Sequence, residues 1–202
     1  MQKKTWPFAR SSHAVLRAGF VLAIVLVLAQ IAAQVVDYAV YDLSIHRLDS
    51  DSHASVFGAL SLAAQGAAAV AAGAAALRSS QGRLRWAAVA ALTGALLVAR
   101  VAIGFKAEIL ILPVAVLFFL LWDATAQEPA DVRRLVRAGL ALLVFSFAVH
   151  VVGPRVVSDL GYSSKSWPYQ IKGLLKHSAE LGGWVLVATG VAAVFVRRNR
   201  DE

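Results

Sequence analysis

The stretch that decides the fold is His46–Leu77, with the sequence HRLDSDSHASVFGALSLAAQGAAAVAAGAAAL. Its first eight residues carry four side chains able to bind a metal ion or to relay a proton. The remainder, Ala54–Leu77, contains twelve alanines and three glycines and no charged residue. About 20 apolar residues are enough to cross a hydrocarbon core that is about 30 Å thick. The stretch therefore predicts a polar loop that leads into a transmembrane helix.

The composition of the whole chain is that of a membrane protein. Hydrophobic residues make up 59% of its 202 residues and charged residues 16%, whereas soluble domains have about 45–50% apolar and about 25% charged residues. The apolar residues lie in blocks of membrane-spanning length. The sequence therefore predicts an all-α, polytopic bundle of six transmembrane helices that forms a single membrane domain, 1–202. The predicted spans are 18–36, 54–77, 86–105, 108–122, 138–152 and 179–196.

The longest polar connection, 155–176, is predicted to contain a helix of a different kind. Over 167–177 the apolar side chains can face one side of a short helix, while Lys172 and Lys176 face another. Amphipathic helices of this type lie in the membrane interface. Pro154 is expected to end the fifth span, because proline lacks the backbone N–H that a helix interior needs.

The distribution of basic residues predicts the orientation in the membrane. With six spans, thirteen of the twenty Lys and Arg residues fall on the side that holds both termini. Cytoplasmic loops carry the excess of Lys and Arg, so both termini are predicted to be cytoplasmic. The Ala, Val and Arg bias is typical of GC-rich bacteria, and the predicted location is a bacterial cytoplasmic membrane. The net charge of +8 is then a topology signal, and no nucleic-acid partner is expected beside the lipid bilayer.

The predicted topology collects ionisable residues at the outer end of the bundle. Arg100 lies about fifteen residues into its span, where a charge in lipid is costly and by default indicates a function and a partner. Glu108, across a predicted hairpin, is the expected partner. This ion pair is predicted to lie in an outward-opening polar cavity. The other predicted lining residues are Gln34, Asp37, His150 and Glu180. The alternative is that these residues only form hydrogen bonds between helices, worth about 0.6 kcal/mol each.

Two groups of residues at the same end are candidate ligands of a divalent metal ion, because imidazole and carboxylate together suit zinc, manganese or iron. The first group is His46, Asp49, Asp51 and His53. Its spacing matches no metal motif, and Asp51 is also a natural N-cap for the second span. In the second group, His177 and Glu180 are three residues apart and project together from a helix. The helix dipole alone would also favour Glu180 near a helix start.

A row of small residues, Ala59, Ala63, Ala67, Ala71 and Ala75, recurs at every fourth position of the second span. Rows of this kind let helix backbones approach closely in lipid. The row predicts a helix at the centre of the bundle, or a seam for a homo-oligomer or a membrane partner protein.

The chain carries little that indicates catalysis. It contains no cysteine, no G-x-S-x-G or H-E-x-x-H sequence and no phosphate-binding glycine loop. The leading hypothesis is a non-enzymatic protein that moves a small solute or ion, or that serves as an accessory subunit. The alternative is a lipid-active enzyme, metal-dependent in one version, that works at the outer leaflet. The His- and acid-rich rim and the 167–177 segment favour this alternative, so the question of enzymatic activity stays open.

Overall fold

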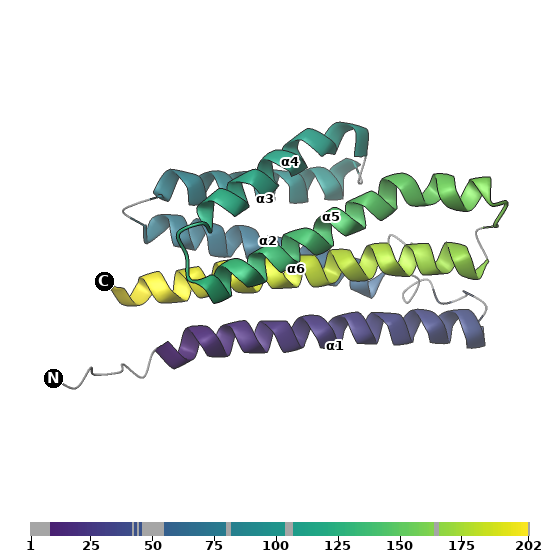
Figure 1. Cartoon of the computed structure of the whole chain (residues 1–202), viewed down its shortest axis with the longest axis horizontal. Coiled ribbons are helices and arrows are strands. Elements are labelled where there is room, and N and C mark those ends of the chain that lie inside the picture. Colours follow the sequence, from purple (N-terminus) through teal and green to yellow (C-terminus); the bar gives the residue numbers. More distant parts are fainter. Residues whose placement is uncertain are drawn as a thin grey trace.

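The computed structural model describes residues 9–41, 43, 45, 55–79, 82–103, 107–163 and 166–201. All regular structure in these ranges is helical, which confirms the predicted fold class (Figure 1). The helices are α1 (Ala9–Tyr41), α2 (Val56–Leu77), α3 (Arg83–Ile103), α4 (Ala107–Ala124), α5 (Ala130–Asp159) and α6 (Trp167–Asp201). Five of them are long and apolar enough to cross a membrane, and α4 is a shorter apolar helix.

The helices run along one long axis and alternate in direction (Figure 1). Both termini lie at one end of the bundle, here called the terminal end. Helices α1, α3 and α5 end toward the opposite end, here called the loop end, and α2, α4 and α6 begin there. At about 1.5 Å per residue, α5 and α6 are about 45 and 52 Å long, whereas α3 and α4 are only about 32 and 27 Å. The α3–α4 hairpin therefore stops short of the tips of α5 and α6 (Figure 1).

The central helix is α6, which packs against α1, α2 and α5 and is the most buried of the apolar helices. Glycines allow its close contact with α5, because a Cβ atom on Gly183 would lie 2.9 Å from the carbonyl oxygen of Gly139. Helix α2, which was predicted to be central, packs mainly against α6 and α3. Helix α2 turns Phe57, Ser61 and Gln65 inward, where Phe57 packs in an apolar cluster, Ser61 donates to Glu180 and Gln65 donates to the Thr93 carbonyl oxygen.

The alanine row of α2 divides into two parts. Ala71 and Ala75 pack in the core, whereas Ala59, Ala63 and Ala67 are exposed in the single chain. An i+4 row drifts around a helix of 3.6 residues per turn, so it cannot keep to one face. The exposed part leaves the predicted oligomer or partner seam as a hypothesis.

The predicted interfacial helix is corrected: residues 167–177 are the first three turns of the continuous helix α6. The segment packs on the end of α1, where the Tyr38 and Trp167 ring centroids lie 4.0 Å apart. Gln34 Nε2 also donates a hydrogen bond of 3.0 Å to Gln170 Oε1. These contacts hold the segment along α1, in line with the rest of α6. Pro168 fits in the first turn, where its missing N–H is not needed.

The predicted end of the fifth span at Pro154 is also wrong. Helix α5 includes Pro154 and continues to Asp159. The proline lies inside the helix and removes one backbone hydrogen bond there. Gly153, the residue before it, lies against Lys172 of α6, so packing between the helices supports the last turns.

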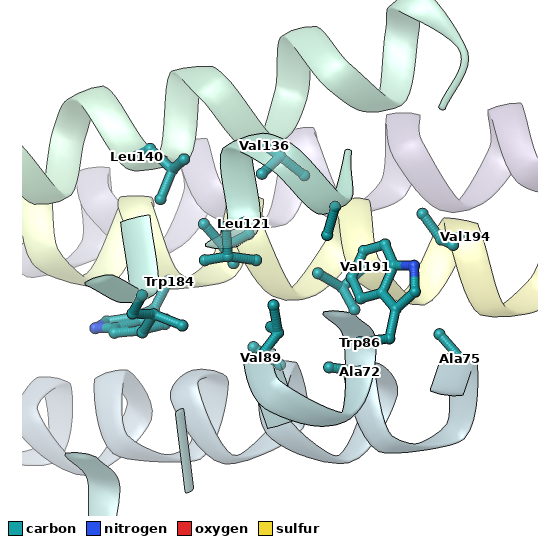
Figure 2. Packing of buried hydrophobic residues seen from close by; sticks show 14 of the residues in the cluster. Ala72, Ala75, Trp86, Val89, Leu121, Val136, Leu140, Trp184, Val191 and Val194 are labelled. Atoms are coloured by element: carbon teal, nitrogen blue, oxygen red, sulfur yellow. The ribbon is translucent and has the colours of Figure 1, made fainter. Parts of the chain in front are cut away.

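The terminal half of the bundle is closed by a packed apolar core (Figure 2). Trp86 and Val89 of α3 meet side chains of α2, α4, α5 and α6 there. The labelled members from those helices are Ala72, Ala75, Leu121, Val136, Leu140, Trp184, Val191 and Val194. The candidate site lies in the other half of the bundle, toward the loop end.

Charged groups hold the terminal end together. Glu128, in the α4–α5 connection, accepts from Arg198 Nη2 at 2.8 Å and lies 3.6 Å from Arg197 Nη1. Arg198 also donates to the Ser79 hydroxyl, which follows α2. These contacts tie the end of α6 to two connections and help to close the terminal end.

Candidate functional site

A cavity of about 570 Å³ lies between α2, α3, α4, α5 and α6, toward the loop end. Its polar lining residues are Gln65, Arg100, Ser146, His150, Lys176, His177 and Glu180. Its other lining residues are Gly58, Ala59, Leu62, Leu96, Val101, Leu110, Val114, Leu117, Phe118, Leu143, Phe147 and Trp184. Cavities of about 300–1,000 Å³ with a few convergent polar groups are typical of small-molecule sites. The size and the lining make this cavity the candidate site.

An ion pair between Arg100 of α3 and Glu180 of α6 dominates the polar part of the cavity. Arg100 Nη1 contacts Glu180 Oε1, and the two side chains are only 19% and 14% exposed. Glu180 Oε1 also accepts a hydrogen bond of 3.2 Å from the Ser61 hydroxyl of α2. His177 Nδ1 lies 3.7 Å from Glu180 Oε2. The carboxylate therefore joins three helices at one level of the bundle.

The described lining has an excess of positive charge. Arg100 and Lys176 are cationic, Glu180 is the acidic residue of the described lining, and His150 and His177 add to the positive charge when protonated. A guanidinium carries five N–H donors, and the contact with Glu180 uses one terminal nitrogen of Arg100. The remaining donors can bind a second anion, and a planar fork suits carboxylate or phosphate.

The cavity becomes apolar with distance from the loop end. Leu96 lies one helical turn deeper than Arg100, and Trp184 lies one turn deeper than Glu180. The wall supplied by α4 consists of Leu110, Val114, Leu117 and Phe118. Leu96, Leu117 and Trp184 also belong to the core that fills the terminal half (Figure 2). The cavity is therefore charged near the loop end and apolar deeper in the bundle, and the packed core closes its inner end. The charged part near the loop end is called the upper part, and the closed inner end is called the floor.

One side-chain atom of Gln65, the oxygen Oε1, has no hydrogen-bond partner among the described residues. Gln65 is 2% exposed and its Nε2 donates to the Thr93 carbonyl oxygen at 3.4 Å. Its Oε1 is buried, and within the described residues it accepts no hydrogen bond. A buried acceptor without a partner costs about 1–3 kcal/mol. Gln65 lines the cavity one turn deeper than Ser61, but its Oε1 atom is buried and does not face the open volume.

The structure brings some predicted lining residues together and separates others. Arg100, His150 and Glu180 line the cavity. The predicted partner of Arg100, Glu108, has its side chain outside the described residues. Gln34 and Asp37 are buried between α1 and neighbouring segments and do not line the cavity, because α1 packs on another side of α6. Asp37 Oδ1 accepts from the Ile45 N–H at 3.0 Å, which orders the chain just after α1.

The predicted metal ligands remain a hypothesis. His46, Asp49, Asp51 and His53 lie outside the described residues. His177 lines the cavity beside Glu180. Across the described ranges, no three His, Asp or Glu side chains are grouped closely enough to hold a metal ion.

Lys176 was expected on the polar face of an interfacial helix, and its place in the cavity lining was not predicted. Lys176 lines the cavity because 167–201 is one helix, which places Lys176 four residues before Glu180 on the same face. Reading 167–201 as one continuous helix would have found this pair. The chain matches no protein-family model, and no curated protein or solved structure is detectably similar to it.

Proposed function

We propose that the protein is a multi-pass protein of a bacterial cytoplasmic membrane that binds a small solute or ion in an outward-facing cavity. It acts without catalysis, either in transport or as the ligand-binding accessory subunit of a larger assembly. All six helices cross the membrane in this proposal, and both termini lie in the cytoplasm. The observation that carries it is the Arg100–Glu180 pair inside a cavity of a largely apolar helical bundle. Charged residues at such positions by default indicate a binding site or pathway.

The shape of the cavity favours access from one side. Its charged part lies toward the loop end, and its floor is the packed core of the terminal half. Basic residues are concentrated at the terminal end, which is therefore assigned to the cytoplasm. A ligand would enter from outside, and release to the cytoplasm would require the core to rearrange.

The orientation can be tested with single cysteines, because the chain contains none. Ser163 lies in the α5–α6 connection and Ala126 in the α4–α5 connection, and both are exposed. In intact cells, Ser163→Cys is expected to react with a membrane-impermeant maleimide. Ala126→Cys is expected to react only after the membrane is permeabilised. The reverse pattern would refute the orientation, and reaction of both in intact cells would refute the crossing of the membrane by α5 between the two positions.

Water in the cavity can be tested with a matched pair on α2. Ala59 and Ala63 are both exposed in the single chain and lie one turn apart, but only Ala59 lines the cavity. Maleimides need a thiolate, which forms in water and not in hydrocarbon. Ala59→Cys is therefore expected to react from outside at least about tenfold faster than Ala63→Cys, which corresponds to about 1.4 kcal/mol. Equal and slow reaction of both cysteines would contradict an outward-open polar cavity.

A further inference from the structure

We propose that the ligand of the cavity is a single-chain lipid with an anionic headgroup, as in an anionic lysophospholipid. This proposal names the ligand class of the outward-facing cavity and so rests on the proposed function. Two features of the cavity support it: a cationic upper part, and an apolar wall above a closed floor.

The upper part of the cavity suits a phosphate group. Arg100 presents guanidinium donors beyond the one that contacts Glu180, and Lys176 adds a second permanent positive charge to the described lining. Glu180 is already engaged by Arg100 and Ser61. A phosphodiester that binds here would form charge-assisted hydrogen bonds, which are about twice as strong as neutral ones. A zwitterionic headgroup would bring its own cation toward Arg100 and Lys176 and would bind less well.

The deeper part suits one hydrocarbon chain. Helix α4 supplies only apolar side chains to the wall, of which Leu117 and Phe118 are the deepest, and Trp184 lies next to the floor. A cavity of about 570 Å³ has the size of a drug-sized ligand site, which fits a single chain better than a two-chain lipid.

The membrane context makes the headgroup the main source of selectivity. Val101 lines the cavity and is 69% exposed, so the wall reaches the outer surface of the bundle. A chain that moves from the bilayer into the cavity leaves one apolar environment for another and gains little from the hydrophobic effect. The difference in affinity between two lipids with the same chain therefore reports the contacts of the headgroup.

The test uses lysophosphatidylglycerol and lysophosphatidylcholine that carry the same dibrominated acyl chain, because bromine quenches nearby tryptophan fluorescence. Each lipid is titrated into the full-length protein in neutral dodecyl maltoside micelles. Saturable quenching is expected with the anionic lipid, and it should be largely lost in Trp184→Phe. The half-saturating concentration of the zwitterionic lipid should be about tenfold higher, which is the ratio that one charge-assisted hydrogen bond supplies.

Variants assign the contacts. Arg100→Gln is expected to bring the two lipids to the same half-saturating concentration, whereas Arg85→Gln should leave the tenfold ratio unchanged. Arg85 is the matched control because it lies on the same helix, pairs with Asp123 at 3.2 Å and is far from the cavity at the terminal end. If Arg100→Gln does not fold, Lys176→Gln is expected to lower the ratio at least threefold. Val114→Phe, which fills the apolar part, should weaken both lipids.

The possible results separate this proposal from the proposed function. Equal affinity for both lipids in the unchanged protein would refute anion recognition. Displacement of the anionic lipid by inorganic phosphate at a similar concentration would identify a free anion as the ligand and would also overturn the proposal. Quenching that does not depend on Trp184 would refute a lipid site, but fast labelling of Ala59→Cys would still support the outward-open cavity. Slow labelling of Ala59→Cys together with no quenching would refute both.

Discussion

Arg100→Leu is expected to lower the free energy of unfolding by about 3 kcal/mol, the lower end of what breaking a buried ion pair costs. The lower end applies because Arg100 and Glu180 keep 19% and 14% of their side-chain exposure. The variant leaves the Glu180 carboxylate among apolar helices with only the Ser61 hydroxyl at 3.2 Å and His177 at 3.7 Å. Replacing both partners by leucine removes both charges, and such replacements are often close to neutral. The double variant is therefore expected to be more stable than either single variant.

The measurement is a double-mutant cycle on reversible unfolding in mixed micelles, with the unchanged protein, both single variants and the double variant. The control cycle uses Arg85→Leu and Asp123→Leu, because that pair also joins two helices but its side chains are 51% and 40% exposed. Exposed pairs of this kind contribute about 0.2–1 kcal/mol. A coupling energy for Arg100 and Glu180 as small as that of the control would show that the pair does not hold α3 to α6.

Gly183→Ala is expected to cost about 1–3 kcal/mol of unfolding free energy, which is typical of overpacking. The added Cβ would lie 2.8 Å from Leu143 Cγ and 2.9 Å from the Gly139 carbonyl oxygen. The carbonyl belongs to the backbone of α5 and cannot rotate away, so α5 and α6 would have to separate. Leu143 also lines the cavity, and the same change is expected to lower the affinity for the cavity ligand.

The matched control for this variant is Gly94→Ala in the middle of α3. A Cβ atom on Gly94 would meet nothing within 4 Å. Alanine is favoured over glycine by about 0.8–1 kcal/mol in a helix interior, so this change is expected to stabilise the protein. The two Gly→Ala changes should therefore shift the unfolding transition in micelles in opposite directions. A shift of the same sign and size in both would contradict the close α5–α6 crossing.

The fold class was predictable because it depends on local properties of the chain. Blocks of apolar residues of membrane-spanning length predict helices whatever their neighbours are. The errors came from local breaking signals that packing overrode. Pro154 was expected to end α5, but the helix continues because its last turns pack near α6. Lys172 and Lys176 suggested an interfacial helix, whereas contacts with Tyr38 and Gln34 of α1 make 167–177 part of α6.

The candidate site was predictable in its residue types and only partly in its contacts. The cost of a charge in lipid singled out Arg100, and the alternation of spans placed His150, His177 and Glu180 at the same end of the bundle. Helices α3 and α6 do not pack closely against each other, so the contact between Arg100 and Glu180 depends on two long side chains that meet in the cavity. No periodicity in the sequence contains that information.

The sequence by itself determined the helical class, the membrane-like apolar blocks and the uneven distribution of basic residues, because each depends on composition along a single segment. Only the tertiary structure decided that α6 is the central helix, that Glu180 contacts Arg100, and that Lys176 and Gln65 share a cavity with them. Neighbour choice and helix rotation are set by the close approach of small residues such as Gly139 and Gly183. That approach depends on the shapes of two surfaces far apart in the chain, so it emerges only when the helices are packed together.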